Sequence, residues 1–217
     1  MSPARGLARA AALLLLTSGA ASAEPAAGTL EGLMAGMARA SGVLAEFREE
    51  KTLALLSAPL ESRGVLHFVP PDRMVRRTLE PAPSWLVVDG RRVLFRDDSG
   101  EAPVDLSSDP SARQFVDHFT AIFRGDLAAL RERYEVRFEA EGPRWRLLLE
   151  PRDALLRRFV ASLTLSGDGE SMREMVLLER DGDRTTTRFG HVETDHVYTP
   201  EELATLFGKG EAGPAAP

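Results

Sequence analysis

Apolar and polar residues alternate along residues 47–81, which is the spacing expected of β-strands that bury one face. Leu66 and Phe68 show this alternation most clearly. Proline-containing turns at Ser57-Ala58-Pro59 and Val69-Pro70-Pro71-Asp72 divide the stretch into three extended segments. The pattern therefore predicts a β-meander with one apolar face and one charged face.

Further strands are predicted on both sides of a helical region. Asp89-Gly90 separates the apolar run from Trp85 to Val88 from the run between Val93 and Phe95, and this is a strong hairpin signal. Residues 98–111 are polar and rich in turn-forming residues, so we expect a connection there. Strand-like patterns recur over residues 134–138, 145–149, 159–165, 172–180 and 184–192. The complete pattern predicts roughly eleven strands.

Helical spacing or capping residues mark four further segments. Thr29 is a candidate N-cap for an amphipathic helix over residues 29–40. Apolar residues at spacings of three and four predict a second helix over residues 111–124. Asp126 is expected to cap a short helix that ends at Arg133, and Thr199-Pro200 starts a last one.

The N-terminus has the pattern of a secretory signal peptide. Arg5 and Arg9 precede an apolar run from Ala10 to Leu16, and Ala21-Ser22-Ala23 matches an A-x-A cleavage site. We expect residues 1–23 to be removed; the alternative is an uncleaved anchor at the membrane surface. We interpret residues 24–207 as a single domain and residues 208–217, rich in Gly, Ala and Pro, as a disordered tail.

Composition narrows the functional classes. The net charge is −6, and it becomes −8 without the two arginines of the signal peptide, which argues against nucleic-acid binding and polybasic binding to anionic lipid. The chain has no Cys, which excludes thiol catalysis, thiolate metal sites and a lipid-anchored N-terminus. An exported protein without disulfides suits a bacterial periplasm.

Five short motifs occur in order along most of residues 29–207. They are Phe47-x-x-x-Lys51, then Pro59-Leu60-x-Ser62-x-Gly64-x-Leu66-x-Phe68, a strand led by Pro71, Val87-x-Asp89-Gly90 and Tyr198-Thr199-Pro200. In their order and spacing the chain resembles the LolA family, the periplasmic carriers of outer-membrane lipoproteins, and looks closest to a divergent branch of it. Many members carry Arg directly before the Pro of the third strand, where it is thought to tether a lid; here that position is Pro70.

The resemblance implies a mainly β fold with helices, of the α+β class. This fold is an unclosed, strongly curved antiparallel β-barrel of about eleven strands, with helices plugging its concave face. The apolar pattern agrees, because strands with one apolar face need a cover. The implied activity is the binding of acyl chains in an apolar cavity under a helical lid.

Candidate site residues follow from this expectation. The cavity candidates are Leu66, Phe68, Met74, Trp85, Val87, Phe95, Trp145, Leu147, Phe159 and Leu163. The lid candidates are Leu33, Met34, Met37, Phe115, Phe119 and Phe123. Any one of them is equally consistent with plain core packing, and a shift of one residue in strand parity would exchange an entire face.

Two charged clusters are the remaining candidates. Arg73, Arg76 and Arg77 are interpreted as contacts for an anionic headgroup or a partner, with a solvated strand face as the alternative. On a regular strand His191, Glu193 and Asp195 would share a face, with His196 next to them. We expect no functional metal and no cofactor there. The chain has neither a G-x-S-x-G motif nor a Gly-rich phosphate loop, so no catalysis is predicted.

Three functions stay open on the sequence. The first is a monomeric periplasmic carrier that takes lipoprotein or other lipidated cargo, such as a glycolipid, from an inner-membrane exporter to an outer-membrane acceptor. The second is a non-catalytic adaptor of an inner-membrane lipid or glycolipid export system, built on the same fold. The third is an enzyme that uses the cluster at residues 191–196.

Overall fold

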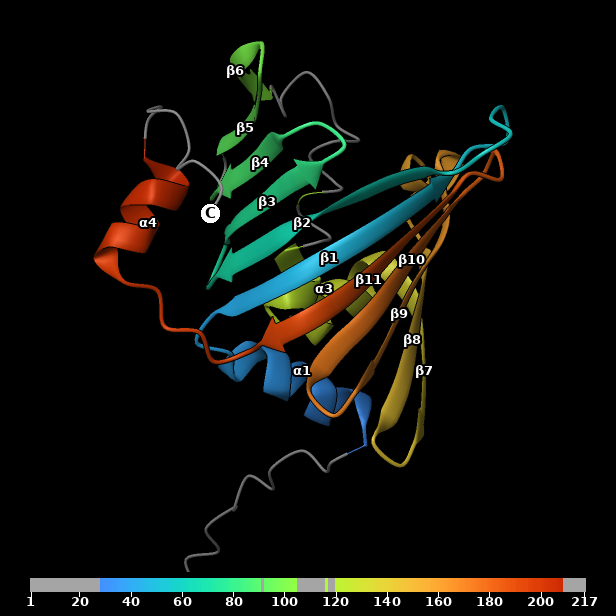
Figure 1. Ribbon diagram of the computed structural model, residues 1–217. Coiled ribbons are helices and arrows are strands. Elements are labelled where there is room, and N and C mark those ends of the chain that lie inside the picture. The colour runs from blue at the N-terminus through green and yellow to red at the C-terminus, as the bar shows by residue number, and fades with distance from the viewer. Residues whose placement is uncertain (1–27, 91, 105–115, 117–119, 209–217) are drawn as a thin grey trace, which may run out of the picture.

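The structure is a computed structural model that describes residues 28–90, 92–104, 116 and 120–208 (Figure 1). The expected signal peptide, nearly all of the expected tail, and the lid candidates Phe115 and Phe119 lie outside the described residues. None of the described helices is long and apolar enough to cross a bilayer.

The described strands form one antiparallel sheet of eleven strands, in the order β6-β5-β4-β3-β2-β1-β11-β10-β9-β8-β7. The first six are β1 (Val43–Thr52), β2 (Leu60–Val69), β3 (Arg73–Glu80), β4 (Ser84–Asp89), β5 (Arg92–Asp97) and β6 (Gly100–Val104). The last five are β7 (Tyr134–Glu141), β8 (Arg144–Pro151), β9 (Val160–Asp168), β10 (Ser171–Glu179) and β11 (Arg184–Glu193).

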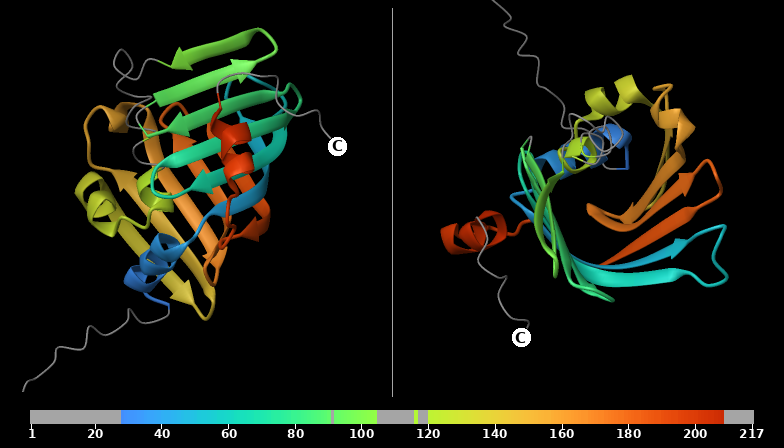
Figure 2. Two further views of the ribbon diagram at one scale, coloured as in Figure 1. Left: turned by 90° about the vertical axis from the view of Figure 1, so that its left-hand side faces the viewer. Right: turned by 90° about the horizontal axis from the view of Figure 1, so that it is seen from above.

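The sheet curves strongly but does not close into a barrel. Pairing of β1 with β11 joins its two meanders in the middle, and β6 and β7 are left as edges (Figure 2). The predicted fold, an unclosed and curved antiparallel barrel, is confirmed.

Helices form where the capping residues predict them. They are α1 (Leu30–Arg39), α3 (Leu127–Arg133) and α4 (Pro200–Phe207), with a short 3₁₀ turn, η1 (Leu156–Arg158). The side chains of Thr29 and Asp126 accept hydrogen bonds from the first turns of α1 and α3, and Thr199 forms a complete capping box with Glu202. Residues 120–123 are also helical, which agrees with the second predicted helix.

Strand β6 is a correction, because the sequence pattern predicted a connection over residues 98–111. The turn before it is built by Asp97, whose carboxylate accepts the Ser99 N–H at 2.8 Å, and Gly100 has a φ of +131°. The strand is short, lies at the edge of the sheet and contains Pro103, which an edge strand tolerates. The sequence of β6 therefore lacks the alternating apolar residues by which the other strands were predicted.

The strand register shows which residues face the concave side. Directly opposed residues of antiparallel strands lie on one face. Phe68, Met74, Val88 and Val93 oppose one another across β2 to β5 and form one buried cluster. A second cluster joins the inner residues of β8 and β9 to α1, so the core lies between the concave face and the helices.

Helix α4 covers part of the opposite, outer face (Figure 2). Val75 and Val87 oppose each other on this face and are almost completely buried. The Arg73 guanidinium lies 3.7 Å above the Phe207 ring and makes a 2.9 Å ion pair with Asp89. The C-terminal helix therefore hides outward-facing apolar residues that a bare sheet would expose.

The segment between β11 and α4 is fastened to the start of β1. The His196 N–H donates to the Gly42 carbonyl at 3.1 Å, and the Tyr198 hydroxyl donates to the Val43 carbonyl at 2.8 Å. The same hydroxyl lies 3.4 Å from Nδ1 of His67 on β2. Burial lowers the pKa of His67 to about 4, and the neighbouring His196 adds to this effect.

This buried histidine predicts a pH dependence of stability. As the pH falls from about 6.5 to about 4, the unfolded chain takes up a proton at His67 that the folded chain does not, so the free energy of unfolding should fall by about 2 kcal/mol. Urea unfolding across this pH range measures the loss. It should be smaller in His67→Gln and unchanged in His191→Gln, whose side chain is exposed. Identical pH profiles for the wild type and His67→Gln would contradict the prediction.

Candidate functional site

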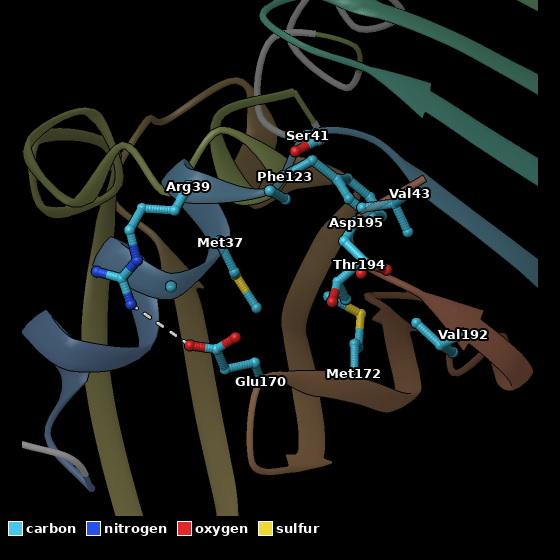
Figure 3. Close-up of a pocket in the computed structure, with 12 residues that line it drawn as sticks. Met37, Arg39, Ser41, Val43, Phe123, Glu170, Met172, Val192, Thr194 and Asp195 are labelled. Atoms are coloured by element: carbon cyan, nitrogen blue, oxygen red, sulfur yellow. Dashed lines mark hydrogen bonds and ion pairs between the residues drawn. The ribbon is translucent and has the colours of Figure 1, made fainter. Parts of the chain in front are cut away.

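A cavity of about 160 Å³ opens between the end of α1, the turn that joins β9 to β10, and the end of β11 (Figure 3). Its lining comes from elements that are far apart in the sequence: Gly36, Met37, Arg39, Ala40, Ser41, Val43, Phe123, Glu170, Met172, Val192, Thr194 and Asp195. Its volume is close to that of an apolar cavity that binds benzene, so it has room for a short piece of an alkyl chain.

Helix α1 forms one wall of this cavity because its apolar residues repeat with helical spacing. Leu30, Leu33 and Met34 are buried against the sheet, and Met37 lies one turn further along on the same side. Met37 and Met172 project into the cavity from opposite walls (Figure 3). Methionine side chains adapt easily to ligands of different shape.

Among the described residues, exposed ion pairs join the two ends of α1 to neighbouring elements. The Arg39 guanidinium lies 3.4 Å from the Glu170 carboxylate at the cavity mouth, and Arg131 lies 2.6 Å from Glu31 at the other end of the helix. All four side chains are more than half exposed. Exposed pairs contribute about 0–1 kcal/mol each. The helix is therefore held chiefly by its buried apolar residues.

Gly125 brings the backbone after the second helix into direct contact with α1. Its φ is +63°, and a Cβ at this position would lie 2.1 Å from the Met34 carbonyl oxygen. Only glycine combines this conformation with so close an approach.

The concave groove beyond the cavity is filled by side chains. Phe123 packs on Phe68 with 5.2 Å between ring centroids, and Leu66 and Met74 complete the layer. On the other side of the groove Trp145, Leu147 and Leu163 pack beneath α1. The buried apolar residues under the helices therefore form two clusters, one on each side of the groove.

An ion pair lies among the apolar residues of the groove. Arg76 faces the groove, where it forms a 2.8 Å ion pair with Glu49 and lies 4.2 Å above the Phe47 ring. Thr187 donates a 2.9 Å hydrogen bond to the same carboxylate. The side chains of Arg76 and Glu49 are 28% and 23% exposed, so the pair is partly desolvated.

Most predicted groove residues lie where the alternation placed them. Leu66, Phe68, Met74, Trp145, Leu147 and Leu163 are on the concave face of the sheet, and the lid candidates Leu33, Met34, Met37 and Phe123 pack against it from the helices. Met172, Val192 and Thr194 were missed, because turns and strand ends carry no periodic signal.

None of the ten predicted cavity residues lines the 160 Å³ cavity, which among the predicted residues is lined by the lid candidates Met37 and Phe123. Four of the ten also lie outside the buried layer of the concave face. Trp85 and Val87 face outward, because Leu86 and Val88 are the inward residues of β4. In a run of four apolar residues no polar residue marks the outer face, so the sequence does not indicate which residues face inward. Phe159 precedes β9 and is half exposed, and Phe95 shares a face with Leu86 but is 41% exposed.

The cluster at residues 191–196 is not presented on one regular strand face. The pairing of β11 with β1 shifts between Gly190 and Glu193, His191 has a φ of +45°, and Asp195 lies beyond the end of the strand. His196 instead contacts two carboxylates, those of Glu193 and Glu202, at 3.2 and 3.4 Å. Among the described residues, Glu179, Asp181 and Asp183 are the acidic side chains close enough together to share an ion.

Comparison with known proteins agrees with this geometry. A family profile described as outer membrane lipoprotein carrier protein LolA-like matches residues 20–209. The chain belongs to this LolA-like family. No match was found among curated protein sequences.

Several solved structures are similar to the LolA-like chain. A LolA superfamily protein from Nitrosomonas europaea is 10% identical, with a TM-score of 0.44 over 82% of this chain and 97% of its own. The MucA/MucB complex of Pseudomonas aeruginosa is 19% identical, with a TM-score of 0.48, and covers 79% of this chain but 57% of its own. A DUF1329 family protein from Desulfovibrio piger is 8% identical, with a TM-score of 0.49, over 80% of this chain and 92% of its own.

The three arginines near Pro70 do not act as one group in this LolA-like chain. Arg76 points into the groove, whereas Arg73 and Arg77 face outward, towards Asp89 and Trp85. Residues one apart on a strand point to opposite faces, which separates Arg76 from Arg77. Arg76 is therefore the member of the cluster that a molecule in the groove would meet.

Proposed function

We propose that this protein binds the acyl chains of a lipoprotein or another lipidated molecule beneath α1 and carries it through the periplasm towards the outer membrane. The observation that carries the proposal is the largely apolar concave face, with a cavity left open at the end of an amphipathic helix. An inner-membrane exporter would be the donor and an outer-membrane protein the acceptor. The proposal involves no chemical step and no cofactor.

Binding requires α1 to move. A cavity of about 160 Å³ is smaller than the roughly 300–1,000 Å³ of typical small-molecule sites. Each methylene group that the groove takes from water contributes about 0.8 kcal/mol. A long acyl chain would therefore offset the burial that Leu30, Leu33 and Met34 lose when α1 moves, and the exposed ion pairs at the rim add little to the cost. Closure of α1 over the emptied groove would favour release.

Native mass spectrometry of the protein, purified from periplasm without detergent, tests the proposal directly. Extra mass that matches an acylated molecule would support a carrier and identify the class of its cargo. A mass of the protein alone, unchanged after incubation with a lipopeptide, would contradict it.

Filling the cavity should weaken binding. Val192 lines the cavity, and Val192→Trp should lower the affinity for a hydrophobic dye or a lipopeptide by roughly tenfold, because the indole takes the space of the ligand. Val197→Trp is the matched control, since Val197 is exposed and outside the cavity. Fluorescence titration measures both variants. Equal affinities would show that ligands do not use this cavity.

The second candidate function is a non-catalytic adaptor of an inner-membrane export system. The close packing of the concave face favours it, because a groove that never opens serves only as a core. This function predicts no ligand in native mass spectrometry and a stable partner protein after cross-linking in cells.

A further inference from the structure

The C-terminal arm, which we define as residues 194–207, follows β11 and ends with α4 on the outer face of the sheet (Figure 2). At its start Asp195 forms a parallel bridge with Gly42, just before β1. No residue of α4, all of which the structure describes, is fully buried. Elements with few buried residues open at a lower free energy than the core. The arm is therefore a separate layer that can leave the sheet while the core stays folded.

Close contacts at Gly42 fix the docked position of the arm. A Cβ at this residue would lie 2.5 Å from the His196 carbonyl oxygen and 2.8 Å from the Tyr198 ring. The Gly42 carbonyl oxygen accepts the His196 N–H, and the Val43 carbonyl oxygen accepts the Tyr198 hydroxyl. Only a residue without a side chain leaves room for so close an approach. The start of β1 is therefore a fitted seat for the arm.

The docked arm covers His67. This residue lies on the outer face of β2, opposite Leu44 of β1 and Val75 of β3. The Tyr198 hydroxyl is 3.4 Å from Nδ1 of His67, and the two ring centroids are 6.0 Å apart. The His196 ring packs edge-on against the Tyr198 ring at a centroid distance of 4.4 Å. Two aromatic rings of the arm therefore shield a histidine that the strands alone would leave on an outer surface.

Charged groups face His67 from several of the elements around it. Burial is the main reason why the pKa of His67 is lowered to about 4; the neighbouring His196 adds to this effect, Glu202 of α4 partly offsets it, and Arg77 of β3 also lowers the pKa. The Glu202 carboxylate also accepts the Thr199 N–H at 2.7 Å. Other charged side chains on this outer face are Glu46, Arg73, Asp89 and Glu193. Two of these are paired, because Arg73 contacts Asp89 and Glu193 contacts His196.

We propose that the C-terminal arm is an acid-sensitive element, which detaches from the outer face of the sheet when His67 takes up a proton. In the docked state the arm shields His67 from water. Once the arm has left, His67 is exposed and binds a proton like a free histidine. Because the released state binds the proton more tightly, acid shifts the equilibrium towards release. Release would uncover Val87, which is almost completely buried beneath α4.

The burial of His67 sets the size of the expected effect. With a pKa of about 4 in the docked state and about 6.5 for an exposed histidine, the ratio of released to docked protein should rise about twentyfold between pH values of about 7 and about 5. Protonation of His196 acts in the opposite direction, because it would strengthen the contacts with Glu193 and Glu202. Those carboxylates are 58% and 44% exposed, so their contacts are weak and the effect of His67 dominates. The inference stands without the proposed carrier activity.

Labelling of a single thiol beneath the arm measures its release in the protein purified from periplasm. The chain has no Cys, so Val87→Cys places one thiol under α4. Its rate of reaction with a disulfide reagent, divided by the rate of a free thiol at the same pH, gives the released fraction. We expect this normalised rate to rise about twentyfold from a pH of about 7 to about 5. Added His67→Gln should reduce the rise to less than about threefold, and added His191→Gln, at an exposed histidine, should leave it unchanged.

Gly42→Ala tests the seat of the arm without a change in charge. Its Cβ would displace the arm, so the normalised rate of Val87→Cys at a pH of about 7 should rise roughly tenfold. Gly190→Ala is the matched control, because a Cβ there would meet no atom within 4 Å and the rate should stay unchanged. Equal rates in the two variants would show that Gly42 does not seat the arm.

Three results would overturn the proposed release. They are a normalised rate of Val87→Cys that does not rise in acid, a full rise that persists in His67→Gln, and equal normalised rates for Val87→Cys and Leu165→Cys. Leu165 is completely buried in the core beneath α1, so equal rates would mean that acid unfolds the whole domain. We expect Val87→Cys to react at least about tenfold faster than Leu165→Cys at a pH of about 5. Thiol labelling needs no ligand, so a failure of the proposed carrier activity would leave this result valid.

Discussion

Gly125→Ala should loosen α1 and lower the free energy of unfolding by about 3 kcal/mol. The new Cβ would lie 2.1 Å from the Met34 carbonyl oxygen and 2.9 Å from the Ala38 nitrogen, so either the helix or the turn must move. We expect α1 to yield, because it is held by side-chain packing and exposed ion pairs, whereas the sheet is held by continuous backbone pairing between its strands. The groove beneath would then open more readily, and the variant should bind a hydrophobic dye more tightly than the wild type.

Gly142→Ala provides a matched control for this prediction. Gly142 has a φ of +59°, close to the +63° of Gly125, but a Cβ there would meet no atom within 4 Å. Both variants carry the same backbone strain, about 1–2 kcal/mol, and only Gly125→Ala also displaces the helix. Urea unfolding, dye titration and hydrogen exchange in residues 30–39 should therefore separate them. Equal dye affinities in the two variants would show that the position of α1 does not control access to the groove.

The alternation of apolar residues predicted about eleven strands because both ends of most strands carry clear turn signals, whereas the unclosed barrel followed from the resemblance to the LolA family. Asp89-Gly90 and Asp181-Gly182-Asp183 lie at turns in the structure as predicted. The pattern failed where polar residues form a strand, as in β6, whose pairing to β5 is supported by the ion pair between Arg96 and Glu101. A polar strand at the edge of the sheet, such as β6, leaves no pattern of apolar residues in the sequence.

The candidate site was harder to predict than the fold. The sequence indicates which residues of a strand face inward where polar residues alternate with apolar ones, as around Leu66 and Phe68. It gives no such indication in the uniformly apolar run from Trp85 to Val88. Val87 is buried although it faces outward, because α4 returns from the far end of the chain to cover it. The cavity itself joins α1 to a turn and to a strand end. Only the tertiary fold brings these together.

The ion pair between Arg76 and Glu49 gives the second large expected effect. Glu49→Leu should lower the free energy of unfolding by about 3 kcal/mol, because it leaves a partly desolvated guanidinium without its carboxylate. Thr187 would lose its acceptor at the same time. Thermal or urea unfolding measures the loss. A decrease below about 1 kcal/mol would mean that the pair behaves like an exposed one.

The double variant Glu49→Leu/Arg76→Met tests whether the unpaired charge of Arg76 causes the loss of stability in Glu49→Leu. Replacing both partners by apolar side chains removes the buried charges together, so we expect stability within about 1 kcal/mol of the wild type. The groove would also gain apolar surface beside Phe47, which should strengthen the binding of simple acyl chains. If a lipid with an anionic headgroup then bound more weakly while an uncharged fatty alcohol bound more strongly, Arg76 would be the group that recognises the headgroup. Equal changes for both ligands would mean that the pair contributes to stability alone.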